Sequence, residues 1–296
     1  MNKRIIIVTF LFLTSLITLR IVSLENHSQS SELEKQSRNA PPPDFNTEIG
    51  SALEKKQTEL EQILKQYQEE ITPESGAVVI DLDDQVKATS NEDHQFVAAS
   101  LYKLFVAYAI YEKIEQGEIS DEQKVPNSSF TVEACLQAMI TVSDNKCGVE
   151  LGNLVNWTQL DQKLENEGYT QTKLDNYDEN GDLDGDKKTS AGDVAKLLSN
   201  LAQGKLLNPE HTDDFLANLK KQQRNDRLPQ GLPRNADVAH KTGELEDYRH
   251  DAGIIREGEK QYIVVMLTAG WENPSQEAPP VFKEFSQALS TYFQHH

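Results

Sequence analysis

The chain has 296 residues, with 48 Asp and Glu against 29 Lys and Arg, so its formal net charge is −19 at pH 7. With 37% hydrophobic and 26% charged residues, the composition is that of a globular protein with an acidic surface, which excludes wholesale disorder. The lack of clustered Lys and Arg argues against a nucleic-acid partner, and two cysteines exclude a disulfide-rich scaffold. No His and Cys spacing indicates structural zinc.

The first 24 residues have the pattern of an export segment. Met1–Arg4 contains two basic residues, and Ile5–Leu19 follows without a charge, as in a secretory signal. No small-x-small cleavage site follows, and the apolar run continues beyond Arg20, so an uncleaved membrane anchor through residues 5–24 stays an alternative. In both cases we expect the rest to be exported, either secreted or membrane-anchored, with an extracellular or periplasmic domain.

Residues 25–45 differ in composition from the rest of the chain. They are rich in Ser, Glu, Gln and Asn and contain Pro41-Pro42-Pro43. Such a segment cannot bury enough apolar surface to offset its chain entropy, so we expect a disordered linker. The folded domain is then residues 46–296.

The folded part contains strand patterns near both ends and helical patterns between them. Helices are expected over residues 46–70, 96–115, 130–142, 157–167, 190–203 and 280–292, and strands over 76–81, 85–88, 237–241, 251–255 and 261–269. The helix over 96–115 is apolar nearly all round, which predicts burial on every side. We expect one sheet formed from both chain ends, with helices on its faces and a helical middle region, an α/β sandwich.

The start of the all-apolar helix carries the first candidate site. Ser100 and Lys103 are three residues apart, so one helix face presents both the hydroxyl and the amine. A lysine in an apolar setting has a lowered pKa, and its neutral amine can take the proton of a serine nucleophile. The motif alone is weak, because Ser143 and Lys146 have the same spacing.

Two further motifs raise the weight of this site. Ser143-Asp144-Asn145 follows the helix over 130–142, and Lys241-Thr242-Gly243 ends a strand pattern, where the glycine lets a substrate approach the backbone. The order Ser-x-x-Lys, Ser-Asp-Asn and Lys-Thr-Gly is the set found in class A β-lactamases and penicillin-binding proteins.

With these motifs, the sequence resembles the class A serine β-lactamase family and its penicillin-recognising relatives. The resemblance covers about residues 46–293 and includes Phe96-Val-Ala-Ala-Ser-Leu-Tyr-Lys103, Ile140-Thr-Val-Ser-Asp-Asn145, Val238-Ala-His-Lys-Thr-Gly243, Asp251-Ala-Gly-Ile-Ile255 and Thr189-Ser-Ala-Gly-Asp-Val-Ala195. It implies the three-layer sandwich of the β-lactamase/transpeptidase fold, with an antiparallel sheet, and makes residues 46–296 a catalytic domain.

The resemblance also implies a role for each motif residue. Ser100 would be the acylated nucleophile and Lys103 its base, while Ser143 would relay a proton to the leaving nitrogen. The substrate-binding residues would be Asn145, which would also hold Lys103, together with Lys241, Thr242, Gly243 and Glu244. Of these, Lys241 and Thr242 would bind the substrate carboxylate. The backbone N–H groups of Ser100 and Glu244 would form the oxyanion hole.

The sequence departs from the family where deacylation is concerned. Class A enzymes carry an Ω-loop glutamate in a Glu-x-x-Leu-Asn pattern, which is absent here. Placing Leu174-Asp-Asn-Tyr177 over the start of that loop puts Asp178 at the glutamate position, with Glu179 beside it. Either carboxylate is a candidate for the catalytic role, and two solvated loop carboxylates are the alternative.

The sequence departs from the family in a second respect. The interval from Ser100 to Ser143 is short for class A enzymes, which predicts a more open site.

Two smaller questions stay open in the sequence. Asp182, Asp184, Asp186, Ser190 and Asp193 have calcium-loop spacing, but Lys187 stands where glycine is expected, so a solvated acidic loop is the default. We therefore predict no metal and no cofactor.

The pairing of the two cysteines is also open. Cys135 and Cys147 lie on either side of the Ser143 motif. Export would permit a disulfide between them, and two buried free cysteines are the alternative.

Three functions fit this pattern. The first is an exported serine hydrolase that opens β-lactam rings through a Ser100 acyl-enzyme. The second is a D-alanyl-D-alanine peptidase acting on peptidoglycan stem peptides. The third is a penicillin-binding sensor that acylates without fast turnover. Each takes a small-molecule β-lactam or a stem peptide as partner, and we expect a monomer.

Overall fold

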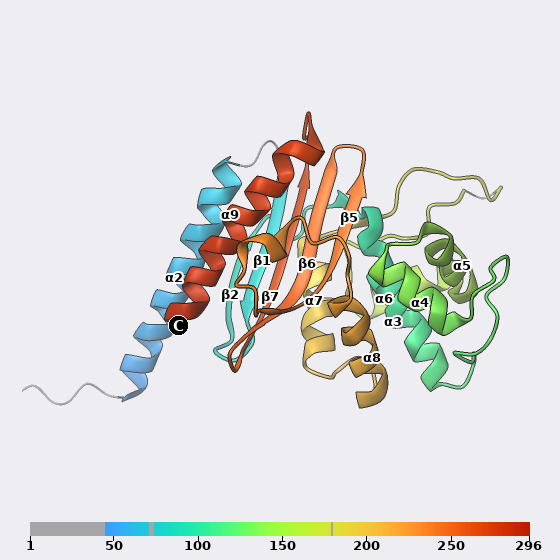
Figure 1. Cartoon of the computed structure of the whole chain (residues 1–296), viewed down its shortest axis with the longest axis horizontal. Coiled ribbons are helices and arrows are strands. Elements are labelled where there is room, and N and C mark those ends of the chain that lie inside the picture. Colours follow the sequence, from blue (N-terminus) through green and yellow to red (C-terminus); the bar gives the residue numbers. More distant parts are fainter. Residues whose placement is uncertain (1–44, 71–73, 179) are drawn as a thin grey trace, which may run out of the picture. The chain divides into compact units, whose positions relative to one another are not determined.

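A computed structural model describes residues 45–70, 74–178 and 180–296 of the chain (Figure 1). The expected export segment over 1–24 and nearly all of the linker over 25–45 lie outside these residues. The chain divides into two compact units, 1–51 and 52–296. Of the first unit, the structure describes only the start of helix α2, which spans Phe45–Glu70. Within the described residues, no helix has both the length and the apolar character needed to cross a membrane.

A five-stranded antiparallel sheet forms the centre of the second unit, with the strand order β2–β1–β7–β6–β5. In Figure 1 the early strands β1 and β2 lie next to the late strands β5, β6 and β7. The strands are β1 Glu74–Asp81, β2 Val86–Ser90, β5 Asp237–Leu245, β6 Tyr248–Glu257 and β7 Lys260–Ala269. The predicted sheet from both chain ends is therefore confirmed.

Each face of the sheet contributes to a separate hydrophobic core, because neighbouring side chains of a strand point to opposite faces. On β1, Val79 packs with Leu60 of α2 and Phe285 of α9 (Pro274–His295). Its neighbour Val78 packs on the other face, in the core that contains helices α3 to α8. These helices are α3 Tyr102–Glu115, α4 Val132–Thr141, α5 Asn145–Val155, α6 Trp157–Asn166, α7 Ala191–Ala202 and α8 Pro209–Lys220.

Helix α3 is the element that the sequence predicts to be buried all round, and every residue from Lys103 to Tyr111 is indeed buried. It starts later than expected, however. Phe96–Val97 forms strand β3, which pairs with β4 (Lys188–Thr189), and Ala99–Leu101 forms the short 3-10 helix η1. The expected helix start at 96 is therefore wrong, because pairing with β4 holds the chain extended up to Val97.

Helices α5 and α8 were not expected from hydrophobic periodicity. Both begin at a side-chain cap: Asp144 accepts a hydrogen bond from the Cys147 N–H, and Asn208 accepts one from the His211 N–H. Pro209 is the first residue of α8, a position that suits proline because its missing N–H would have no helical partner there. Capping signals therefore mark these helices better than their apolar spacing does.

Candidate active site

Ser100 lies in η1, at the turn that leads into α3, and two backbone contacts fix this turn from outside. The Ala98 N–H donates to the Lys187 carbonyl at 2.7 Å, and His250 Nε2 lies 2.8 Å from the Val97 carbonyl oxygen. Ala99, directly before Ser100, has a φ of +44°, in the left-handed region that non-glycine residues rarely adopt. The surrounding strands and loops thus hold the serine in a constrained conformation.

His250 is a neutral side chain with a defined role in this support. Its Nδ1 accepts from the Thr268 N–H at 3.1 Å, so its Nε2 carries the proton and donates it to Val97. The side chain is fully buried, and this burial lowers its pKa to about 4. Motif reasoning did not identify His250, because its partners are backbone groups distant in the sequence.

The amine of Lys103 connects the first two motifs. Its Nζ lies 3.2 Å from Ser100 Oγ, 2.8 Å from Asn145 Oδ1, and 2.7 Å from the Ser143 carbonyl oxygen. The side chain is wholly buried, and burial lowers its pKa to about 8, with Arg224 acting in the same direction and Asp144 opposing it. A neutral amine is therefore accessible near neutral pH, next to the serine hydroxyl.

The structure also separates the two Ser-x-x-Lys motifs. Lys103 is buried against Ser100, whereas Lys146 lies exposed on α5. The side chain of Ser143 instead faces two buried amines, because its Oγ lies 3.0 Å from Lys241 Nζ and 3.2 Å from Lys103 Nζ. Ser143 has a φ of +61°, in the short connection between α4 and α5.

Lys241 on β5 provides the second buried amine. Its Nζ donates to Ser143 Oγ and, at 2.8 Å, to the Thr242 carbonyl. Burial lowers its pKa well below the ordinary value, and the neighbouring Lys103 lowers it further. Gly243 is the next residue but one after Lys241, at the point where β5 packs on the turn that carries Ser100, called here the nucleophile turn. A Cβ at Gly243 would lie 3.0 Å from His250 Cδ2 and 3.3 Å from Leu101 Cγ. The glycine therefore permits this packing, a reason different from the substrate approach that the sequence suggested.

A cavity of about 110 Å³ lies where these segments meet. It is lined by Ser100, Ser143, Asn145, Thr242, Arg224 and Glu244. Pockets for drug-sized ligands measure about 300–1,000 Å³, so this cavity fits a reacting group and leaves the rest of a substrate outside it. The three motifs thus converge on one cavity, as their predicted joint role requires.

Arg224 is a cavity residue that motif reasoning missed. It lies between α8 and η2 (Leu228–Gly231), and its guanidinium forms an ion pair with Glu244. Glu244 also pairs with Arg227, which is 1% exposed. The sequence predicted a role for the backbone N–H of Glu244, in the oxyanion hole, and that role stays a prediction. It gave no role to the Glu244 side chain. Three arginines in the segment before the Lys-Thr-Gly strand were the available signal, but no fixed spacing distinguishes Arg224 among them.

The structure does not bring Asp178 to this cavity. Its carboxylate accepts hydrogen bonds from the backbone N–H groups of Asn180 and Asp182 at 2.9 and 2.8 Å, and Asp178 is not among the described residues that line the cavity. These bonds lower the pKa of Asp178. The carboxylate thus closes its own turn, and the geometry gives its predicted catalytic role no support. Glu179 lies outside the described residues.

A lysine holds the segment before Asp178 in place. Lys187 Nζ lies 3.6 Å from the centroid of the Trp157 ring, and it donates to the Leu174 carbonyl and, at 2.6 Å, to Asn176 Oδ1. Burial lowers the pKa of Lys187 to about 8. Because its own carbonyl accepts from Ala98, Lys187 joins this loop to the nucleophile turn.

The calcium hypothesis has no support in the described residues. Asp193 Oδ2 accepts from Thr172 Oγ1 at 2.8 Å and from the Gln171 N–H at 2.9 Å, so Asp193 serves the structure of its own region. Asp182, Asp184 and Asp186 are exposed. Over the described part of the chain, no three His, Cys, Asp or Glu residues are grouped closely enough to hold a metal ion.

The two cysteines form a disulfide, which settles the question that the sequence left open. Cys135 on α4 and Cys147 on α5 have Cα atoms 5.1 Å apart and leave no free cysteine among the described residues. Their helices pack side by side, so residues twelve apart in sequence come within bonding distance. The bridge therefore encloses Ser143 and Asn145 in a short covalent loop.

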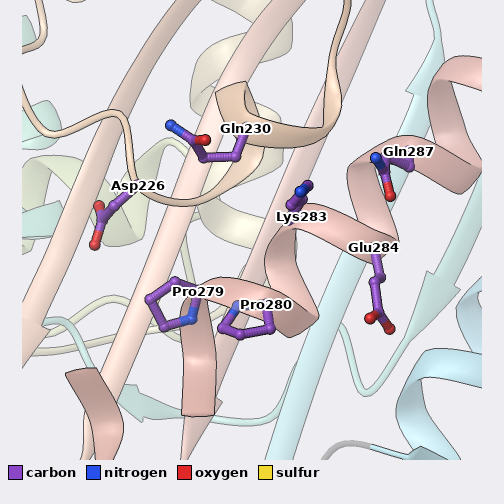
Figure 2. A pocket seen from close by; sticks show the side chains of 7 residues that line it. All are labelled: Asp226, Gln230, Pro279, Pro280, Lys283, Glu284 and Gln287. Atoms are coloured by element: carbon purple, nitrogen blue, oxygen red, sulfur yellow. The ribbon is translucent and has the colours of Figure 1, made fainter. Parts of the chain in front are cut away.

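A larger cavity, of about 500 Å³, lies between η2 and α9 (Figure 2). Figure 2 shows Asp226 and Gln230 on one side and α9 side chains, among them Lys283 and Glu284, on the other. None of the site residues predicted from the sequence is among its described lining residues. The chemistry that the motifs predict belongs to the smaller cavity around Ser100.

Comparison with known proteins agrees with this geometry. The model of the β-lactamase enzyme family matches residues 55–293. The chain belongs to this family. None of the curated proteins matches it.

Solved structures with this fold cover about four-fifths of the chain. PBP-A is 22% identical with a TM-score of 0.70, over 79% of this chain and 97% of its own. A variant of the last common ancestor of Gram-negative class A β-lactamases is 20% identical with a TM-score of 0.71, over 80% and 99%. A β-lactamase from Burkholderia vietnamiensis is 17% identical with a TM-score of 0.71, over 79% and 96%. The β-lactamase-like fold expected from the sequence is therefore confirmed.

Proposed function

We propose that this member of the β-lactamase family is an exported serine hydrolase that opens β-lactam rings through an acyl-enzyme on Ser100. The observation that supports it best is the position of Lys103, whose buried amine contacts both Ser100 and Ser143. A serine hydroxyl needs a base to become a nucleophile, and the lowered pKa of Lys103 supplies one near neutral pH.

The contacts support a complete acylation sequence. The neutral Lys103 amine takes the proton of Ser100 Oγ, and the oxygen attacks the β-lactam carbonyl carbon. The backbone N–H groups of Ser100 and Glu244 would bind the resulting oxyanion. When the carbon–nitrogen bond of the ring breaks, Ser143 donates its proton to the leaving nitrogen. Ser143 regains a proton from the Lys103 ammonium, 3.2 Å away, so the proton of Ser100 ends on the ring nitrogen.

Lys241, Thr242 and Arg224 are the groups proposed to bind the substrate carboxylate. Thr242 and Arg224 line the cavity, while Lys241 Nζ lies 3.0 Å from the hydroxyl oxygen of Ser143. Asn145 would hold Lys103 with its side-chain oxygen, which lies 2.8 Å from the amine. We propose a monomer with a β-lactam or a peptidoglycan stem peptide as its small-molecule partner.

A second candidate follows from the loop around Asp178. Turnover of a β-lactam needs a group that activates water for deacylation, and the Asp178 carboxylate is engaged in its own turn. A chain that acylates and then releases the product slowly would act as a D-alanyl-D-alanine peptidase or a penicillin-binding sensor. A PBP-A variant with this fold, 23% identical, is described as an acyl-enzyme complex with penicillin G.

We further propose the division of the chain into an export signal or anchor over 1–24, a linker over 25–45 and a catalytic domain over 46–296. The disulfide supports export, because such bridges form and persist in oxidising compartments. The last residue of the proposed linker, Phe45, is already the first residue of α2.

A chromogenic cephalosporin, followed by mass spectrometry of the intact protein, tests these functions. Steady turnover supports a β-lactamase, whereas a burst of about one equivalent that then stops supports the sensor. Release of D-alanine from a stem-peptide mimic supports the peptidase. Ser100→Ala must abolish the covalent adduct; an adduct that persists in this variant contradicts the assignment of the nucleophile.

A further inference from the structure

The described residues that line the Ser100 cavity carry one positive and one negative charge. Among its described lining residues, Arg224 is the one cation and Glu244 the one anion, and the two form an ion pair. The buried Lys241 amine adds little positive charge, since burial lowers its pKa well below the ordinary value. A substrate carboxylate therefore enters a cavity whose permanent cation already has a partner.

Glu244 is held more firmly on one side than on the other. One carboxylate oxygen pairs with Arg227, which is 1% exposed and also donates to the His250 carbonyl at 3.0 Å. Breaking that contact would leave a buried guanidinium without its anion, which is costly. The other oxygen pairs with Arg224, whose side chain is 51% exposed, and an exposed pair of this kind contributes little stability.

From these contacts, we propose that Glu244 determines substrate specificity by competing with the substrate carboxylate for Arg224. The inference rests on the proposed function and narrows its substrate class. While Glu244 keeps its contact with Arg227, the acid of a β-lactam must displace the second oxygen from Arg224. The site then gains little from the acid of a substrate, and it accepts β-lactams in which that acid is esterified nearly as well.

The test compares a penicillin with its methyl ester as acylating agents, using mass spectrometry to obtain the second-order rate constant of each. In the unmodified protein we expect the acid to react at most about fivefold faster than the ester, because Arg224 already has Glu244 as its partner. A preference for the acid of a hundredfold or more overturns the proposal. This measurement needs no variant and does not depend on how substitutions fold.

Glu244→Gln removes the competing charge but keeps an oxygen that can accept from Arg227. We expect it to raise acylation by the acid about fivefold and to leave the ester unchanged. Glu246→Gln is the matched control, since it removes the same charge from an exposed position two residues along the chain. Equal changes for acid and ester, or an equal gain in the control, contradict the role of Glu244.

Arg224→Gln provides the opposite perturbation. Without Arg224, Glu244 keeps only Arg227 as a partner, and its second carboxylate oxygen faces the incoming acid with no cation between them. Acylation by the acid should therefore fall at least tenfold while the ester changes little. A parallel fall of both overturns the proposal. If neither compound acylates the unmodified protein, the proposed function itself fails, and this inference fails with it; acylation without the expected selectivity contradicts Glu244 alone.

Discussion

The Ser100 cavity and the loop after Leu174 differ in what their polar groups contact. In the cavity, Ser100, Ser143 and Asn145 all point to the same buried amine of Lys103. In the loop, the Asp178 carboxylate contacts its own turn, and Lys187 joins the loop to neighbouring aromatic rings. The contacts that acylation requires are therefore assembled, while those that would activate a deacylating water are not visible among the described residues.

The largest effect should follow from removing the amine of the assembled cavity. Lys103→Ala should lower the rate of acylation by a penicillin by about 10²–10⁴-fold, the usual contribution of a general base. In the unmodified protein the rate should rise with pH and level off above about pH 8, because only the neutral amine accepts the proton. Stopped-flow acylation across pH measures both.

Lys146→Ala is the matched control for this substitution. Lys146 has the same spacing from a serine as Lys103 but lies exposed, so its removal should change the acylation rate less than twofold. Comparable losses in the two variants would mean that burial does not distinguish the two motifs. The contrast between cavity and loop would then no longer rest on an assembled general base.

The disulfide should contribute the next largest effect, on stability. The bridge joins residues separated by twelve positions, and a loop of this size restricts the unfolded chain by about 3 kcal/mol in the chain-entropy model. The double substitution Cys135→Ala and Cys147→Ala should lower the free energy of unfolding by that order, as measured by urea titration. It should also slow acylation, since the loop contains Ser143 and Asn145. Unchanged acylation would show that the helices position these residues without the bridge.

A smaller effect concerns the support beneath Ser100. The folded pKa of His250, about 4, lies below the ordinary value of 6.5, so the folded state binds the proton less well than the unfolded chain. Its contribution to stability is fully present above pH 6.5 and is lost as pH falls towards 4, by about 2 kcal/mol between pH 7 and pH 5. Urea titrations at these pH values measure it. His250→Gln removes the titrating group, so the same slope in that variant would assign the pH dependence to another residue.

The three motifs could be predicted from the sequence because each is a short stretch with fixed spacing. The sheet could be predicted too, since Gly76–Asp81 and Gln261–Ala269 are apolar runs near opposite chain ends that pair side by side. Hydrophobic periodicity served less well for α5 and α8, whose starts depend on Asp144 and Asn208 as caps.

The rest of the site depends on contacts between residues distant in sequence. Arg224 has no motif, and its position opposite Glu244 follows from how the segment after α8 packs beside β5. His250 contacts Val97, 153 positions earlier. Asp178 shows the converse limit: alignment to a family position identifies the residue, but the hydrogen bonds of its own turn decide where the carboxylate points.

The smallest expected effect concerns the loop rather than the cavity. Asp178→Asn keeps the size of the side chain and removes its charge, and its amide oxygen can still accept from the N–H groups of Asn180 and Asp182. If the carboxylate serves only this turn, the lifetime of the acyl-enzyme, followed by mass spectrometry after a penicillin pulse, should change less than twofold. A lifetime prolonged tenfold or more, with acylation unchanged, would instead assign the deacylating carboxylate to Asp178. That outcome would require the turn to move during the reaction, since Asp178 is not among the described residues that line the cavity.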